Sequence, residues 1–144
     1  MLNDFYKQFK SGTDIRGVAS EGVVGQEVNL TDEVVRNMAG GFARFLGNKL
    51  SKKITDMKVA VGRDSRISGP RITDIVIKTL SDYGVEVLDC GLSTTPSMFM
   101  TTVELGCDAA VQITASHHPF NRNGLKFFTR QGGLEGADIT AILE

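Results

Sequence analysis

Short apolar runs, typical of buried strands, alternate along this 144-residue chain with segments whose apolar residues recur at helical spacing. This alternation constrains the fold more than any other feature of the sequence. Buried strands are predicted at residues 58–62, 85–88 and 108–114, with helices between them at residues 69–83 and 95–103. Short connections between such elements require right-handed crossovers and a sheet covered on both faces. We therefore expect one α/β domain over residues 1–144, a three-layer α/β/α fold with a mixed, mostly parallel sheet.

The clearest predicted helix covers residues 31–50, where Thr31 is suited to be the N-cap and apolar side chains recur at helical spacing. The pair Gly40-Gly41 lies inside this helix and weakens it by roughly 1 kcal/mol per glycine. Close packing of a neighbouring element against the pair is a reason for such residues to occur there.

The elements at the two ends of the chain are less regular. The polar, glycine-bounded segment 11–17 is predicted to be a loop. A strand at residues 124–129 follows the strand at 108–114 with no helix between them, so the two are expected to be antiparallel. The dipeptide Asn123-Gly124 is predicted to form the turn, and residues 137–144 a helix.

Composition excludes several classes of protein. The hydrophobic content of 41% supports a packed core, and no apolar run is long enough to span a membrane. The segment 1–10 lacks the apolar region of a signal peptide, which predicts a cytoplasmic protein. The net charge of −1 favours neither nucleic acid nor a membrane as partner. Cys90 and Cys107 match no metal motif and are expected to be reduced and mostly buried.

Local charge is more informative than net charge. Between Ala109 and Leu134 there is no Asp or Glu, whereas Arg122, Lys126, Arg130 and both histidines fall in this window. A basic window in a nearly neutral chain indicates a small anionic ligand rather than a polyanion. Chance clustering of surface cations is the alternative.

The apolar run that precedes Ser116 leads directly into the segment Thr114-Ala115-Ser116-His117-His118-Pro119. A serine hydroxyl needs a base, a metal or strong stabilisation of an anion to act as a nucleophile. On an extended backbone His117 and His118 point in opposite directions, so at most one is expected to share a site with Ser116. The alternative is an ordinary polar turn between two strands.

Missing motifs narrow the chemistry. The chain has no G-x-S-x-G elbow, which disfavours acyl hydrolysis, and no H-E-x-x-H or Cys/His set, which makes a zinc site improbable. It also lacks the Walker A lysine motif and the dinucleotide-binding G-x-G-x-x-G. The functions that these missing motifs leave open are phosphoryl transfer and anion binding.

Three cationic residues outside the serine segment are candidate phosphate ligands. A turn before Lys126 would bring its ammonium back to the serine, although a solvent-facing strand lysine is an equal alternative. Arg16 lies in a glycine-bounded loop, which suits phosphate clamping, whereas a local ion pair with Asp14 is the simpler interpretation. Arg63 precedes a helix whose N-terminus would attract an anion, unless the loop is purely structural.

Three motifs follow one another along the chain. They are Gly12-Thr13-Asp14-Ile15-Arg16-Gly17, then Val61-Gly62-Arg63-Asp64-Ser65-Arg66 with Ser68-Gly69-Pro70, then Thr114-Ala115-Ser116-His117 with Pro119 and Asn123-Gly124-x-Lys126. Together they resemble the motifs of the α-D-phosphohexomutases, the family of phosphoglucomutase, phosphomannomutase and phosphoglucosamine mutase. The resemblance covers essentially the whole chain and corresponds to the first of the family's four domains.

The resemblance implies a mutase that interconverts hexose 1-phosphate and hexose 6-phosphate through a phosphoserine and a bisphosphosugar. Ser116 would be the nucleophile and, once phosphorylated, a metal ligand. Lys126 and Arg16 would contact the transferring group and help proton transfer, and His117 would orient the phosphoserine loop. The resemblance does not decide which of these three residues would be the general acid or base.

Other positions are carried over more loosely. Thr13, Asn123 and Arg63 are predicted to contact substrate or phosphate. Thr13 stands where some members have an aromatic residue, which affects substrate contact. His118 stands where many members have Asn, so it is given no role.

The resemblance also implies partners that these residues do not provide. Mg²⁺ would offset the phosphoryl charge, yet the family's Asp-x-Asp-x-Asp metal loop belongs to its second domain and is absent here. The residues that select glucose, mannose or glucosamine phosphate lie in later domains, and a glucose 1,6-bisphosphate-type activator is expected. We therefore expect this chain alone to be folded but inactive. The alternative function is a stand-alone phosphosugar-binding module without catalysis.

Overall fold

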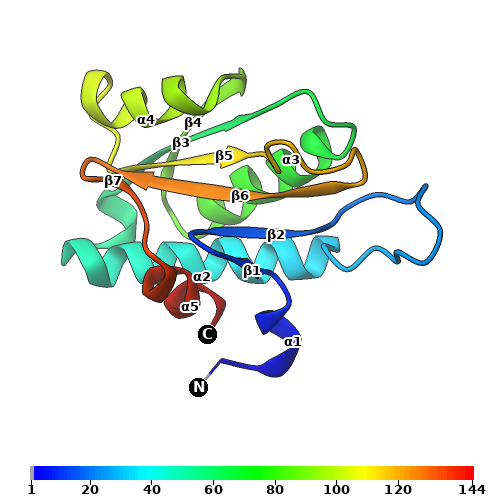
Figure 1. Cartoon of the computed structure of the whole chain (residues 1–144). Coiled ribbons are helices and arrows are strands. Elements are labelled where there is room, and N and C mark those ends of the chain that lie inside the picture. Colours follow the sequence, from blue (N-terminus) through cyan, green and yellow to red (C-terminus); the bar gives the residue numbers. More distant parts are fainter. Residues whose placement is uncertain (1) are drawn as a thin grey trace.

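A seven-stranded sheet divides the structure into three layers (Figure 1). The computed structural model describes residues 2–144. The strand order is β1-β2-β6-β5-β3-β4, with β7 beside β6. The strands are β1 (Lys10–Ser11), β2 (Asp14–Val18), β3 (Lys58–Arg63), β4 (Glu86–Leu92), β5 (Ala109–Ile113), β6 (Arg122–Thr129) and β7 (Gly132–Gly133).

The sheet is mixed, as predicted. β3 pairs in parallel with both β4 and β5, whereas β6 is antiparallel to β5. β2 and β7 are in turn antiparallel to β6, so they run in the same direction as the three central strands. Only β1 and β6, among the described strands, run the other way. The carboxyl ends of β3, β4 and β5 therefore share one edge of the sheet, where ligands bind in α/β folds.

Helices cover both faces of the sheet (Figure 1). The main core lies between the sheet and α2, α3 and α5, and a smaller cluster lies between the sheet and α4. The helices are α1 (Asp4–Lys7), α2 (Asp32–Leu50), the 3-10 helix η1 (Ile54–Asp56), α3 (Gly69–Asp82), α4 (Thr95–Glu104) and α5 (Gly136–Leu143). The α/β/α expectation is thus confirmed. Among residues 2–144, no helix combines the length and the apolar character needed to cross a bilayer.

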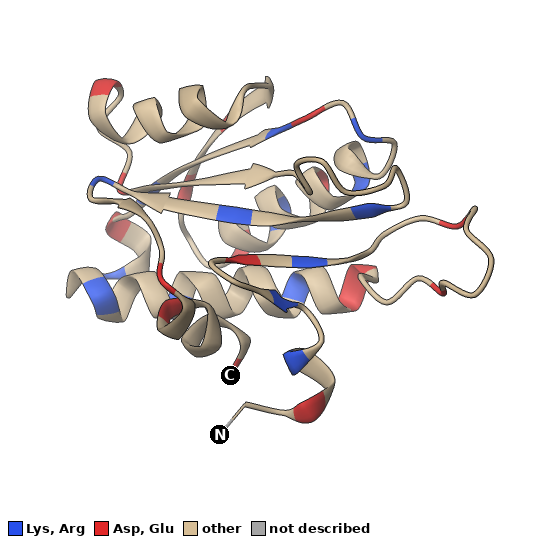
Figure 2. Ribbon diagram, in the orientation of Figure 1, with Lys and Arg blue, Asp and Glu red and all other residues tan. Residues whose placement is uncertain are grey.

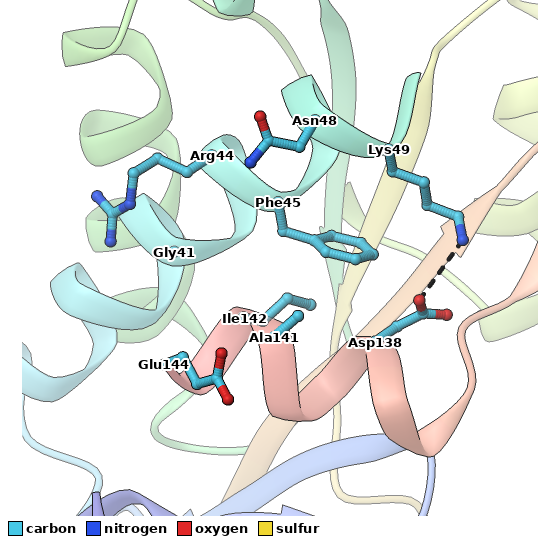
Figure 3. A pocket seen from close by; sticks show the side chains of 9 residues that line it. All are labelled: Gly41, Arg44, Phe45, Asn48, Lys49, Asp138, Ala141, Ile142 and Glu144. Carbon is cyan, nitrogen blue, oxygen red and sulfur yellow. Dashed lines mark hydrogen bonds and ion pairs between the residues drawn. The ribbon is translucent and has the colours of Figure 1, made fainter. Parts of the chain in front are cut away.

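The glycine pair of α2 makes the close contacts that its composition suggests. A Cβ at Gly41 would collide with the carbonyl oxygen of Ile142 in α5, and one at Gly40 would lie 2.7 Å from the hydroxyl of Tyr83. Figure 3 shows Gly41 on α2 and Ile142 on the neighbouring α5. The cost in helix propensity is therefore offset by close packing of α5 on α2.

The prediction of a loop over segment 11–17 is wrong. Residues 14–18 form β2, which pairs with β6 and is joined to β1 by a two-residue turn at Gly12 (φ 61°). Ile15 is fully buried in the main core. Asp14 and Arg16 lie on the other face of the strand and neutralise each other at 3.0 Å, so the polar composition does not prevent a buried strand.

The turn predicted at Asn123-Gly124 is also misplaced. Both residues are inside β6, which begins at Arg122, and Gly124 pairs with Arg16. A Cβ on Gly124 would overlap the carbonyl oxygen of Ile15. The glycine therefore marks a close approach of β2 to β6 rather than a reversal of the chain.

Candidate functional site

The connection between β5 and β6, residues 114–121, is here called the serine loop. Ser116 adopts a left-handed conformation (φ 52°), and the amide of His118 donates to the carbonyl of Ala115, which closes a tight turn. Such a conformation costs about 1–2 kcal/mol for a residue with a Cβ, so the surroundings must hold it. The side chain of Ser116 is exposed at the edge of the sheet where β3 and β5 also end.

One cationic side chain contacts this serine, and a second is linked to the first through a shared carboxylate. A terminal nitrogen of Arg16 donates to Ser116 Oγ at 3.2 Å and to Asp14 Oδ2 at 3.0 Å. Lys126 Nζ donates to the other oxygen, Asp14 Oδ1, at 3.0 Å. The register of β2 against β6 produces this arrangement, because Arg16 pairs with Gly124, two residues before the lysine. The structure therefore brings Ser116, Arg16 and Lys126 into one cluster.

The cluster has a net positive charge, but it also contains carboxylates, which the acid-free window 109–134 does not predict. Asp14 and Asp64 come from other segments and lie among its cations. Figure 2 shows the acidic and basic positions of β2 beside the basic positions of β6. Four cations lie at the serine loop or are linked to it through Asp14, counting Arg16, Arg66, Arg122 and Lys126, against these two carboxylates. The excess of two positive charges matches the charge of a phosphate monoester dianion.

The two histidines do not point in opposite directions as predicted, because the backbone turns at Ser116. Their rings lie 5.3 Å apart, tilted by 35°. Partial desolvation and the positive charges of Arg16 and Arg122 lower the pKa of His118 below its usual value. His118 thus lies within the electrostatic field of the cluster, and its neutral form is favoured. His117 is exposed beside it.

Three other predicted site residues lie apart from this cluster. Arg63 ends β3 and donates to the carbonyl of its neighbour Asp64 at 3.4 Å. Asn123 is fully buried, and its amide donates to Ser68 Oγ at the start of α3. Thr13 is exposed in the β1–β2 turn, at the end of β2 away from the serine loop. No hydrogen bond joins any of these three residues to Ser116 in the described chain.

Four residues around Ser116 were missed as functional candidates. Asp14 bridges the two cations, whereas Asp64, Arg66 and Thr114 hold the backbone of the serine loop. A signal for two of them was present in the sequence. The loop after β3 and the loop after β5 leave adjacent parallel strands at the same edge, so charged residues in one loop are expected to meet the other.

These residues alone do not form a magnesium site. Mg²⁺ prefers about six oxygen ligands, several of them waters and carboxylates. Within residues 2–144 no group of three or more His, Cys, Asp or Glu side chains is placed to hold a metal. Both oxygens of Asp14 and of Asp64 are already engaged by hydrogen-bond donors. Ser116, in contrast, is exposed to solvent.

A pocket of about 590 Å³ lies elsewhere, between α2 and α5 (Figure 3). Phe45 and Ile142 form its apolar part, and the pair Lys49–Asp138, 3.5 Å apart, closes one side. None of the predicted site residues lines this pocket. The chemistry-bearing residues are instead on the open edge of the sheet.

Comparison with known proteins gives this cluster a context. The family model "Phosphoglucomutase/phosphomannomutase, alpha/beta/alpha domain I" matches residues 7–144. The chain belongs to this family. A phosphoglucosamine mutase of Bacillus mycoides is 36% identical over 138 residues, covering 92% of this chain and 28% of that protein. One of Lactobacillus helveticus is 40% identical over 122 residues, covering 84% and 25%.

Solved structures agree with the assignment to the phosphoglucomutase/phosphomannomutase family. A family protein from Burkholderia thailandensis superposes with a TM-score of 0.73 at 27% identity, covering 99% of this chain and 30% of that one. A structure from Thermus thermophilus gives a TM-score of 0.75 at 23% identity and supports the fold alone. The chain spans about a quarter of the length of the curated relatives that it matches.

Proposed function

We propose that this chain carries the phosphoserine of a phosphohexomutase, an isomerase of carbohydrate metabolism that interconverts hexose 1-phosphate and hexose 6-phosphate. The observation that supports this most is the position of Ser116. Its hydroxyl is exposed on a left-handed turn, 3.2 Å from the guanidinium of Arg16, in a cluster with two excess positive charges. The relatives named as phosphoglucosamine mutases point to the same chemistry.

The proposed reaction transfers two phosphoryl groups, one from Ser116 to the sugar and one from the sugar back to Ser116. In the first step a free hydroxyl of the hexose phosphate attacks phosphorus, the bond from phosphorus to Ser116 Oγ breaks, and the sugar hydroxyl gives up its proton. The product is a bisphosphorylated hexose and a free serine, which takes up a proton. After the sugar reorients, Ser116 Oγ attacks the phosphorus of the other phosphate and gives up its proton. The bond from that phosphorus to the sugar oxygen breaks, the sugar oxygen takes up a proton, and Ser116 is phosphorylated again. A glucose 1,6-bisphosphate-type activator would enter at this halfway point.

The residues around Ser116 have distinct parts in this scheme. Arg16 contacts Ser116 Oγ directly and would follow the phosphoryl oxygens during transfer. Lys126 is linked to Arg16 through Asp14 and would supply a second positive charge. His117 would orient the phosphoserine or share in proton transfer from its exposed position on the turn. Thr13, Asn123 and Arg63 stay predictions for substrate contact.

The scheme needs groups beyond residues 1–144. We propose that Ser116 contributes one oxygen to a Mg²⁺ site whose other ligands lie in the further length that the relatives have. The same length would hold the residues that choose among glucose, mannose and glucosamine phosphates. The proposed partners are accordingly a hexose phosphate and further domains of the same protein, in the cytoplasm, with no nucleic acid or membrane.

A second candidate function is a phosphosugar-binding module without catalysis. Asp14 favours it, because this carboxylate already accepts from both Arg16 and Lys126, so no phosphoryl group on Ser116 is needed to hold these two cations in place. Such a module would bind hexose phosphate reversibly and would never carry a phosphoryl group itself.

Mutase assays with Mg²⁺ and glucose 1,6-bisphosphate separate the two functions. Ser116→Ala in the protein is expected to lower kcat by at least about 10³-fold, since the covalent route is lost. Ser65→Ala, an exposed serine in the loop after β3, is the matched control and is expected to leave kcat unchanged. Full activity of Ser116→Ala would refute the mutase mechanism.

A further inference from the structure

The guanidinium of Arg66 is used completely by the backbone of the serine loop. A guanidinium has five N–H donors in a fixed plane. In Arg66, the two terminal nitrogens donate to four main-chain carbonyls that belong to the serine loop and the first residue of β6. These carbonyls are Ser116 at 2.6 Å, His118 at 2.9 Å, Pro119 at 2.7 Å and Arg122 at 3.2 Å.

The fifth donor connects this arginine to a carboxylate that reaches the other side of the same turn. Arg66 Nε donates to Asp64 Oδ2 at 3.3 Å, and the same oxygen accepts the hydroxyl of Thr114 at 2.7 Å. Thr114 Oγ1 in turn accepts the amide of Ser116 at 3.0 Å. The amide and the carbonyl of Ser116 are thus both fixed by the loop that follows β3.

We propose that Arg66, acting through Asp64 and Thr114, is the positioning residue that holds Ser116 in its left-handed conformation for phosphoryl transfer. It is a positioning residue and not a phosphate ligand, because all five of its donors are occupied and its side chain is 12% exposed. Arg16 differs in this respect, since its Nε is buried with no partner among the described residues and its terminal nitrogen faces Ser116 Oγ. In this proposal Arg66 fixes the backbone of the serine loop, and Arg16 binds the anion.

The inference rests on the proposed function for its catalytic part only. An error of about 1 Å in the placement of a reacting atom costs on the order of 100-fold in rate. Lysine keeps the charge of Arg66 but has three donors on a flexible stem, so it cannot reproduce the planar set of contacts. Loss of the clamp is therefore expected to affect the rate of transfer far more than the binding of substrate.

The test compares Arg66→Lys with Arg130→Lys in the protein. Arg130 also donates to main-chain carbonyls, those of Gly106 and Cys107, but at the far end of β6. Amide hydrogen exchange of residues 115–121 is expected to be at least about tenfold faster in Arg66→Lys and unchanged in Arg130→Lys. Thr114→Val removes only the hydroxyl link and is expected to accelerate exchange at the amide of Ser116.

A second measurement tests the catalytic consequence. With Ser116 phosphorylated, the single-turnover rate constant for transfer to a hexose phosphate is expected to fall about 100-fold in Arg66→Lys, with KM changed less than about threefold. Unfolded molecules lower the amplitude and not this rate constant, so a loss of stability alone does not imitate the result. Thr114→Val, should Arg66→Lys not fold, is expected to change the rate constant in the same direction.

The outcomes distinguish the clamp from the proposed function. Unchanged exchange of the serine loop in Arg66→Lys and in Thr114→Val overturns the clamp. Faster exchange with a transfer rate within about threefold of the wild-type rate overturns its role in catalysis. A wild-type protein that never carries a phosphoryl group on Ser116 overturns the proposed function and the catalytic role together, and the exchange data alone then decide whether the clamp exists.

Discussion

Asp14 is the residue on which the charge balance of the site depends. It is buried to 7% exposure and accepts from both Arg16 and Lys126, so it holds two cations beside Ser116 that would otherwise repel each other. A phosphoryl group on Ser116 would compete with this carboxylate for the same donors. Asp14 thus keeps the site assembled when no phosphate is present.

Asp14→Asn is expected to lower the free energy of unfolding by about 2 kcal/mol, because two charge-assisted hydrogen bonds in a partly buried cluster are weakened. Asp4→Asn removes the exposed pair with Lys7 and is expected to cost less than about 0.5 kcal/mol. Urea unfolding of both variants measures the difference. Equal, small effects of the two substitutions would contradict the role given to Asp14.

His118 makes the stability of the folded protein depend on pH. Its pKa is lowered in the folded protein, mainly by desolvation and by Arg16, so the unfolded chain binds the proton more tightly. The contribution of His118 to stability therefore falls as pH decreases through the ordinary histidine value of about 6.5. Between about pH 7.5 and pH 5.5, the wild-type protein is expected to lose more stability than His118→Gln.

At the scale of elements, the site depends on the close pairing of β2 with β6. Gly124 permits it, and Gly124→Ala is expected to cost about 3 kcal/mol, because two main chains must move apart. Gly133→Ala is the control, since a Cβ there has nothing within 4 Å. Thermal unfolding followed by circular dichroism measures both variants, and a neutral effect of Gly124→Ala would contradict the packing described.

The sequence predicted the elements whose pattern is local and missed those that depend on partners. The helix at residues 31–50 and the buried strands carry their own periodicity and caps, and they form nearly as expected. β2 was missed because its charges are neutralised by each other and by Lys126, which lies on the neighbouring strand β6 but far away in the sequence. The pattern around Gly124 predicts a turn because a glycine that permits close approach of another backbone looks the same in the sequence as a glycine that permits a turn.

For the candidate site, too, the sequence predicted the residues that stand in local motifs and missed those whose role depends on a partner elsewhere in the chain. Ser116, Arg16 and Lys126 stand in recognisable motifs, and the structure brings them together through Asp14. The role of Arg66 depends on four carbonyl groups of a loop about 50 residues away in the chain. Main-chain acceptors have no residue type, so no pattern of side chains reveals them.

At the scale of the whole molecule, the described residues supply the serine and the cations of the proposed reaction but not a metal site. We therefore expect residues 1–144, produced alone, to unfold cooperatively in urea, because they contain a continuous core. The same domain is expected to show no hexose phosphate mutase activity with Mg²⁺ and glucose 1,6-bisphosphate. Turnover by this domain above the level of its Ser116→Ala variant would contradict the division of the site proposed above.

The most direct test of the central claim is the intact mass of the protein, including the further length that its relatives have, before and after incubation with glucose 1,6-bisphosphate. The account predicts a gain of one phosphoryl group that peptide mapping places on Ser116, and its loss when excess hexose phosphate is added. Ser116→Ala is predicted to show neither change. Absence of any phosphoryl group on Ser116 in a protein that is active as a mutase would contradict the account.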